Sequence, residues 1–555
     1  MEEIGTEPAR RSFLSRLAPS IPGTIAATAF FCASLTPSLI PRDPVMQGLL
    51  SGAISAIGYE IANILAILWR YLEIPAPRMG WRVFRRAVYL GCALAVLWAL
   101  WNAADWQNIT REVAGLEPVD TSHPLTVAGY AFGVFVLLYI VFRVLGSVFD
   151  AIARGLARVL PKRVSAIIAV VAVAWIAWAV ADGVLVQRAL EAADKSFETA
   201  DLLIEPEVPQ PTDPAKTGSP ASLIVWEEMG RHGRAFVATA PTQAEIATFH
   251  EDAMEPIRVY VGRRSADTAE DRAELALQEL IRAGGFERSN LVVMVPVGTG
   301  WMDPGGQDTL DFILGGDVAT VAAQYSYLTS VLSLITNPEY GVEQARALFQ
   351  KIYGYWQTLP KDSRPRFFVH GLSQGAFNSQ MTLPLFDLLV DPIDGGLWAG
   401  SPFISPTWQR VRDGRAEGSP VWRPVFGNSS LARVRNQEGG ADIGDPPWGP
   451  MRFVFLHYGS DAIVNFTFGS AFRRPGWFNE PRPPDVSPEL SWLPLVTMFQ
   501  LGLDMAVSLQ VERFGHYYVA PDYIDAWAAV LDPEDWSPER AEELKAIFVA
   551  RGPSF

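Results

Sequence analysis

Cysteine and histidine are scarce in this sequence, and both shortages limit the chemistry that it can perform. The 555 residues include two cysteines and six histidines. Cys32 and Cys92 both lie in apolar runs, which excludes a disulfide framework and a cysteine-based zinc site in the C-terminal half. A catalytic nucleophile must therefore be a residue other than cysteine, and its base must come from the six histidines.

Basic residues are also in deficit. Lysine and arginine number 45 against 60 aspartates and glutamates, which gives a formal net charge of −15. Such a chain has no basic surface with which to neutralise a phosphate backbone, so nucleic acid is not an expected partner. No P-loop is present and no GxGxxG follows a strand-like run, so nucleotide chemistry has no support. We expect no cofactor and no metal.

Apolar residues, in contrast, are plentiful and are concentrated before residue 190. Each apolar run is close to the ~20 residues that cross a bilayer core. We therefore predict a transmembrane domain over residues 1–188, with Pro37 and Pro41 kinking or ending its first helix. The five predicted spans are 22–40, 45–69, 87–104, 125–147 and 165–187.

The short loops predict the orientation of these spans. Loops 70–86 and 148–164 are rich in arginine and lysine, which places them in the cytoplasm. The loop between them has Arg111 as its only basic residue and lies beside several tryptophans, which places it outside. We therefore expect a multi-pass protein of the cell membrane, with a cytoplasmic N-terminus and an extracytoplasmic C-terminal domain.

Two features of the apolar region allow more than one interpretation. Glu60 lies inside the second span, where an ionisable group either has a function or is hydrogen-bonded to a neighbouring helix. Gly129 and Gly133 form a small-xxx-small pair that could seat another helix closely. Neither feature indicates catalysis.

The remainder of the chain predicts a linker and then a mixed domain. Residues 189–220 are polar and rich in proline, which is typical of an extended linker. From 221 to 555, short β-branched runs alternate with helical patterns, and one helix is expected over DTAEDRAELALQELIRAGGF. This alternation predicts a mostly parallel sheet flanked by helices. The expected strands are RAFVAT at 234, IRVYVG at 257, LVVMVPVG at 291, RFFVHG at 366 and RFVFLHYG at 452.

The candidate nucleophile is Ser373, at the centre of Gly371-Leu372-Ser373-Gln374-Gly375. This GxSxG pattern is weak alone, but RFFVHG reads as a strand that runs into it and AFNSQMTLPLFDLLV as a helix that follows. That context is typical of a nucleophile elbow, the strained strand-to-helix turn of α/β-hydrolases. The alternative is an ordinary turn whose serine only caps the helix.

The order of the α/β-hydrolase triad, serine then acid then histidine, selects the partners of Ser373. His516 is the histidine that follows the rest of the expected sheet. Asp461 leaves the strand RFVFLHYGSD between them and can orient the imidazole, although it could also be a turn-capping aspartate. Asp391 and Asp394 follow the elbow helix and would lie at the opposite edge of the sheet.

The oxyanion hole of such a site needs two backbone N–H groups. One belongs to the residue after the nucleophile, here Gln374. The other should come from the loop PVGTGWMDP, in which Thr299 or Gly300 is the expected donor.

Several long collinear stretches are similar to a bacterial family of membrane-anchored α/β-hydrolases, in which a multi-span N-terminal domain precedes a hydrolase domain. The resemblance implies Ser373, Asp461 and His516 as the triad and says little about the substrate. The elbow departs from the GESLG-like sequence of the family. The matching stretches are SLTPSLIPR, PIRVYVGRRSADTAEDRAELALQELIRAGGFERSNLVVMVPVGTGWMDP, GLSQG, WGPMRFVFLHYGSDAIVNF, RRPGWFNEPRPPDVSP, GHYY and DAWAAVL.

Three functions remain open on the sequence. The first is hydrolysis of a carboxylic ester, with lipids among the candidate substrates, through an acyl-enzyme on Ser373. The second is acyl transfer from the same intermediate, and the third is a catalytically idle membrane scaffold. The aromatic stretches 403–411 and 477–499 would form an apolar lid over the site or pack the domain onto its membrane half.

Overall fold

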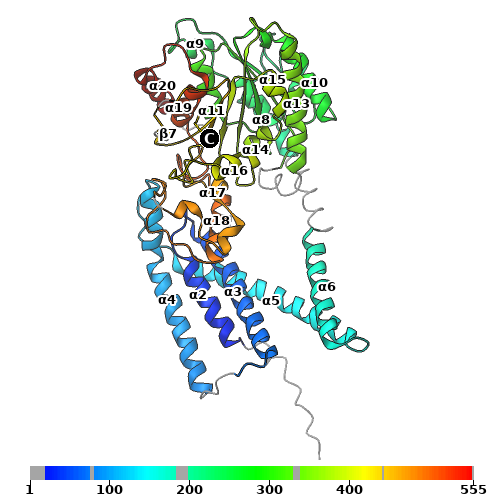
Figure 1. Cartoon of the computed structure of the whole chain (residues 1–555), viewed down its shortest axis with the longest axis vertical. Helices are drawn as coiled ribbons and strands as arrows, with labels where there is room; N and C mark the ends of the chain where they lie inside the picture. The colour runs from blue at the N-terminus through cyan, green and yellow to red at the C-terminus, as the bar shows by residue number, and fades with distance from the viewer. Residues whose placement is uncertain are drawn as a thin grey trace, which may run out of the picture. The chain divides into compact units, whose positions relative to one another are not determined.

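The computed structural model describes residues 19–75, 81–182, 198–328, 338–440, 443–444, 446–479 and 481–552. The chain divides into two compact units (Figure 1). Unit 1 contains residues 1–178 together with 470–473 and 489–503, and unit 2 contains the rest. Two short C-terminal segments thus belong to the N-terminal unit.

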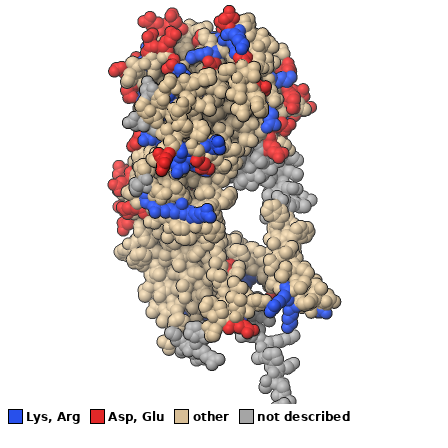
Figure 2. Space-filling model, viewed as in Figure 1, with Lys and Arg blue, Asp and Glu red and all other residues tan. Residues whose placement is uncertain are grey.

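Unit 1 is built from apolar helices. Among the described residues, four of them are long and apolar enough to cross a membrane. Their exposed side chains include large apolar residues such as Trp101 and Leu125, which are 86% and 88% exposed. Figure 2 accordingly shows few charged side chains over most of the visible surface of this unit. The helices are α2 (Ile21–Ser34), α3 (Pro44–Tyr71), α4 (Trp81–Val113), α5 (Pro124–Leu156) and α6 (Lys162–Asp182).

The helix at the first predicted span, 22–40, is shorter than the prediction. Helix α2 has 14 residues and ends at Ser34, so it is about 21 Å long. Pro37 explains the early end, because a proline disfavours the helical conformation of the residue before it. Residues 35–43 continue without regular structure to the start of α3. Part of the fifth predicted span, 183–187, lies outside the described residues.

Glycines of α3, and not of α5, make the close helix contact in this unit. A Cβ atom on Gly48 would lie 2.9 Å from the carbonyl oxygen of Val127, and one on Gly52 would lie 2.5 Å from that of Ala131. Gly129 and Gly133 on α5 have no heavy atom within 4 Å of such a Cβ among the described residues. The small-residue pair that brings two backbones together is therefore Gly48 and Gly52.

Glu60 has a hydrogen-bond partner on its own helix, and that partner contacts the start of the neighbouring helix. Its Oε2 accepts a hydrogen bond of 3.5 Å from Nδ2 of Asn63, one turn further along α3. The Oδ1 of Asn63 in turn accepts from the hydroxyl of Ser20, at the start of α2. Glu60 thus belongs to a polar contact between two helices.

Unit 2 contains an eight-stranded sheet in the order β1-β3-β2-β4-β5-β8-β6-β7, parallel except for β7. Central strands such as β2 are buried along their whole length, because helices cover both faces. The predicted parallel sheet is confirmed. Its strands are β1 (Ile257–Val261), β2 (Asn290–Val295), β3 (Val318–Ala323), β4 (Arg366–Leu372), β5 (Gly395–Ala399), β6 (Ala432–Asn436), β7 (Gly439–Gly440) and β8 (Arg452–Leu456).

The helices of unit 2 form one layer on each face of the sheet (Figure 1). Helices α8 (Gly230–Ala238), α10 (Ala269–Arg282), α13 (Pro338–Thr358) and α16 (Pro406–Asp413) contribute to the core on one face. Helices α11 (Pro304–Ile313), α19 (Ala520–Leu531) and α20 (Pro538–Arg551) contribute to the core on the other. The predicted helix after residue 266 is confirmed as α10.

One local prediction in this unit is wrong. RAFVAT at 234 is part of helix α8 and not a strand, because Phe236 and Val237 bury one face of a helix that begins at Gly230. Within the expected linker 189–220, the structure describes residues 198–220. Asp201 accepts a hydrogen bond from the backbone N–H of Arg231, and the carbonyl of Pro214 accepts one from Arg282. The described residues 198–220 are therefore attached to the surface of unit 2.

Candidate active site

Ser373 occupies a sharp turn between β4 and α14 (Gln374–Gln380). Its φ and ψ are 55° and −122°, a strained conformation for a residue with a side chain, and its side chain makes no capping hydrogen bond. A Cβ on Gly371 would overlap the backbone of Gly375, and one on Gly375 would overlap the carbonyl of Val295. Both glycines of GxSxG are therefore required for the chain to turn this tightly.

Asp461 and His516 form a buried pair. Nδ1 of His516 lies 2.6 Å from Oδ2 of Asp461, and the two residues are 4% and 0% exposed. The other carboxylate oxygen accepts the backbone N–H groups of Ile463 and Val464 at 2.8 and 3.4 Å. Asp461 thus caps α17 (Ala462–Asn465) and faces the imidazole at once. This arrangement fixes the carboxylate and presents Nε2 of the imidazole on the opposite side of the ring.

Tyr518 is a third member of this cluster that the sequence did not reveal. Its hydroxyl donates a 2.7 Å hydrogen bond to Oδ2 of Asp461, the oxygen that also faces His516. Burial raises the pKa of Tyr518 well above its ordinary value, and the charge of Asp461 raises it further, so the hydroxyl stays protonated and keeps donating. The only signal in the sequence was its position two residues after His516.

The backbone around His516 is held by two further contacts. The N–H of His516 donates to the carbonyl of Ser508 at 2.8 Å, and the N–H of Gly515 donates to the hydroxyl of Ser460 at 2.9 Å. Ser460 precedes Asp461 directly and is fully buried. The loops that carry the acid and the histidine are therefore fastened to one another.

The end of β5 connects Ser373 to His516. The backbone N–H of Ser373 donates to the carbonyl of Ala399 at 2.9 Å. At the next residue, Gly400, a Cβ atom would overlap Cε1 of the His516 ring. Nε2 of His516 is buried and makes no hydrogen bond with any described residue. The structure thus brings the elbow, the imidazole and the carboxylate to the carboxyl edge of the sheet.

The loop after β2 lies beside the elbow, because Gly375 approaches the carbonyls of Val295 and Pro296. Gly300, one of the two expected oxyanion donors, cannot serve in this conformation, since its N–H donates to the carbonyl of Val297 at 2.9 Å. Thr299 is half-buried in the same turn. Gln374 is the first residue of α14, where a backbone N–H points out of the helix end.

Asp391 and Asp394, the other aspartates considered for the acid, lie at the opposite edge of the sheet. Asp391 pairs with Arg364 at 2.6 Å, and Asp394 accepts the backbone N–H of Phe367 at 2.7 Å. Arg364 lies two residues before β4 and Phe367 is its second residue, whereas Ser373 follows its end. These two carboxylates are therefore a strand length away from the elbow.

Two other histidines have structural contacts instead. Nδ1 of His370 lies 2.7 Å from the carbonyl of Leu397, and Nε2 of His457 accepts the N–H of Ser401 at 3.1 Å. Burial lowers the pKa of His370 to about 4 and that of His457 to about 3. Both rings are therefore neutral near pH 7.

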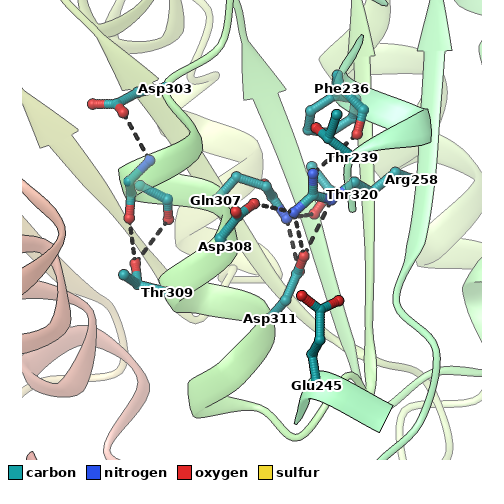
Figure 3. A network of polar contacts seen from close by, with 12 residues as sticks. Phe236, Thr239, Glu245, Arg258, Asp303, Gln307, Asp308, Thr309, Asp311 and Thr320 are labelled. Atoms are coloured by element: carbon teal, nitrogen blue, oxygen red, sulfur yellow. Dashed lines mark hydrogen bonds and ion pairs between the residues drawn. The ribbon is translucent and has the colours of Figure 1, made fainter. Parts of the chain in front are cut away.

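A second buried polar cluster lies on α11 (Figure 3). Nη2 of Arg258, on β1, is 2.6 Å from both Asp308 and Asp311. Gln307 donates to Asp311 and to Thr320, on β3. Every charge in this cluster has a partner, which is typical of an internal structural ion pair. Within the described residues, no group of three or more His, Cys, Asp or Glu residues is arranged to hold a metal ion.

Comparison with known protein families agrees with this arrangement. Residues 257–544, more than half of the chain, match the model of the Alpha/beta-hydrolase family. The chain belongs to this alpha/beta-hydrolase family. Residues 35–241 match the Alpha/beta-hydrolase family N-terminus, so the resemblance of both parts to one family is confirmed. No curated protein matches this chain.

Proposed function

We propose that this alpha/beta-hydrolase is a membrane-anchored serine hydrolase that cleaves carboxylic esters. The observation that carries the proposal is the buried Asp461–His516 pair at the sheet edge that also carries Ser373 in its strained turn; Nε2 of His516 makes no hydrogen bond with any described residue. Converging serine, histidine and aspartate side chains are typical of nucleophilic catalysis. The four long apolar helices support a membrane anchor.

In the proposed reaction His516 Nε2 takes the proton of Ser373 Oγ as the oxygen attacks the ester carbonyl carbon. The resulting oxyanion accepts hydrogen bonds from the N–H groups of Gln374 and Thr299. The C–O bond to the alcohol then breaks, and His516 returns the proton to the departing oxygen. Water, deprotonated by His516, releases the acid and restores Ser373.

The proposed location is the outer side of the cell membrane, and the proposed substrate is an apolar ester. The basic loops 70–86 and 148–164 favour the cytoplasm, so the hydrolase unit would lie outside the cell membrane. A lipid or another apolar ester is the substrate class that a membrane anchor favours, because such molecules are concentrated in the bilayer. Insertion of a protease site after residue 198, probed from each side of sealed vesicles, tests the location.

The direct test is labelling of the full-length protein in detergent with a fluorophosphonate. We expect wild type to be labelled and Ser373→Ala to be unlabelled, with esterase activity lower by about a thousandfold or more. Ser405→Ala is the matched control, since its hydroxyl is also buried and makes no hydrogen bond with the described residues. Absence of labelling in wild type would contradict the proposal, and transfer of a labelled acyl group to an alcohol would point to acyl transfer.

A further inference from the structure

The chain between the proposed acid and base leaves unit 2 and returns to it. Residues 470–473 and 489–503 belong to unit 1, although Asp461 and His516 both belong to unit 2. Helix α18 (Val496–Ala506) begins in unit 1, and its last three residues belong to unit 2. We call residues 489–503 the strap. In Figure 1 α18 is drawn in orange beside the blue helices α2 and α3.

The strap is packed into the helical unit by apolar contacts. Val496 is 3% exposed and forms one cluster with Leu50 and Ile54 of α3. Leu493, Phe499 and Leu503 of the strap pack against the same cluster, together with Phe30 and Ala33 of α2. Burial of several large apolar side chains is the main force that holds two segments together.

Gln500 of the strap adds a polar contact to the backbone at the end of α2. Its side-chain Nε2 donates to the carbonyl of Thr36 at 3.1 Å and lies 3.5 Å from that of Ser34, and the residue is 2% exposed. Helix α2 ends at Ser34, whose carbonyl also accepts a 2.9 Å hydrogen bond from Nε2 of Gln47. The amide of Gln500 therefore binds the chain just beyond the end of α2, and its loss would remove the donor from the half-buried carbonyl of Thr36.

The far end of the strap leads directly to His516. Helix α18 ends at Ala506, and only Val507 separates it from Ser508. The carbonyl of Ser508 accepts the backbone N–H of His516 at 2.8 Å. A displacement of α18 would thus reach the residue that holds the backbone of the proposed base.

We propose that the helical unit, through Val496 and Gln500 of the strap, is a positioning partner of His516 and not an anchor alone. This inference rests on the proposed function for its catalytic meaning. Its structural content is independent of that function: loosening the strap from α2 and α3 loosens the segment from Ser508 to His516.

The test compares full-length variants in detergent by hydrogen exchange and by fluorophosphonate labelling. Val496→Ala removes two methyl groups from the strap cluster, and Gln500→Met keeps the shape of the side chain while it removes both N–H donors. Val127→Ala is the matched control, because Val127 is 0% exposed in the separate cluster of α2, α4 and α5. We expect amide exchange in peptides covering residues 508–516 to be about tenfold faster in both strap variants than in the control. Exchange in β4 should not change.

Labelling separates failure of the inference from failure of the proposed function. Slower labelling of Ser373 in both strap variants, with the control at the wild-type rate, would support the inference. Exchange in 508–516 that matches the control would overturn it, whether or not wild type is labelled. Faster exchange in 508–516 without any labelling of wild type would support the positioning contact and contradict only the proposed chemistry.

Discussion

The carboxylate of Asp461 illustrates how much one side chain does in this site. One oxygen caps α17, and the other lies between the imidazole of His516 and the hydroxyl of Tyr518. The capping and acid interpretations of Asp461 were alternatives on the sequence, yet the structure assigns one oxygen to each contact. A carboxylate held by four donors has little freedom to turn away from the histidine.

Tyr518 provides a test of this arrangement. We expect Tyr518→Phe to lower kcat about tenfold without changing KM, because one hydrogen bond to a charged acceptor is lost while the imidazole contact remains. Steady-state kinetics with a small ester measures this change. Tyr458→Phe is the matched control, since Tyr458 donates to Asp522 and packs on Tyr518. An equal effect of the two substitutions would show that loss of either buried hydroxyl is enough, and that the bond to Asp461 has no special importance.

At the scale of residues, the sequence indicated the serine, the acid and the histidine because their order along the chain is characteristic of the fold. It could not indicate Tyr518, Ser460 or Gly400. Their roles depend on loops that come together only after folding, such as the contact of Gly515 with Ser460. The sequence also did not indicate the turn inside the loop PVGTGWMDP, in which the N–H of Gly300 donates to the carbonyl of Val297.

At the scale of elements, α11 begins at a carboxyl group that responds to pH. Asp303 caps this helix by accepting the N–H of Gly305 at 2.8 Å, and it is 1% exposed. Burial raises the pKa of Asp303 from 3.8 to about 7, and hydrogen bonds from Tyr523 and Gly305 offset only part of this rise. The folded state therefore binds this proton more tightly than the unfolded state.

The sign of the pH dependence follows from this shift. The contribution of Asp303 favours the folded state at acid pH and is lost as the pH rises from 3.8 to about 7. Asparagine caps a helix as well as aspartate but carries no charge, so Asp303→Asn should raise the melting temperature more at about pH 8 than at about pH 5. Thermal unfolding of both proteins at these two values measures the difference. An equal increase at both would contradict the raised pKa.

Strands and helices were predictable where their patterns are long. The β-branched runs of β2, β4 and β8 and the amphipathic α10 were identified from sequence. Strand β3, VATVAA, was missed because three of its six residues are alanine and give little pattern. RAFVAT was assigned to a strand because two turns of a buried helix can show the same apolar residues.

At the scale of the whole molecule, the sequence suggested contiguous domains of residues 1–188 and 221–555. The structure instead assigns the strap to the N-terminal unit. No local pattern could show this, because the hydrogen bonds of Gln500 join residues more than 460 positions apart. Such contacts are fixed by the fold as a whole and not by neighbouring residues.

Removal of unit 1 should therefore lower the solubility of unit 2. We expect residues 198–555, produced alone without detergent, to aggregate, because Leu493, Val496 and Phe499 lose the helices that cover them. Size-exclusion chromatography measures this outcome. Replacement of these three residues by serine should restore a soluble species. A monodisperse wild-type fragment would show that the strap finds another cover within unit 2.

The position of Gln500 near the end of the chain also has a consequence for biosynthesis. A ribosome makes α2 and α3 first, but the residues that complete the cluster of Leu50 and Ile54 are among the last to emerge. Leu50 and Ile54 must therefore remain without their strap contacts while more than 400 residues are synthesised. A prematurely terminated chain would keep these residues without those contacts, which makes an unfinished product recognisable to proteases and chaperones before it can act.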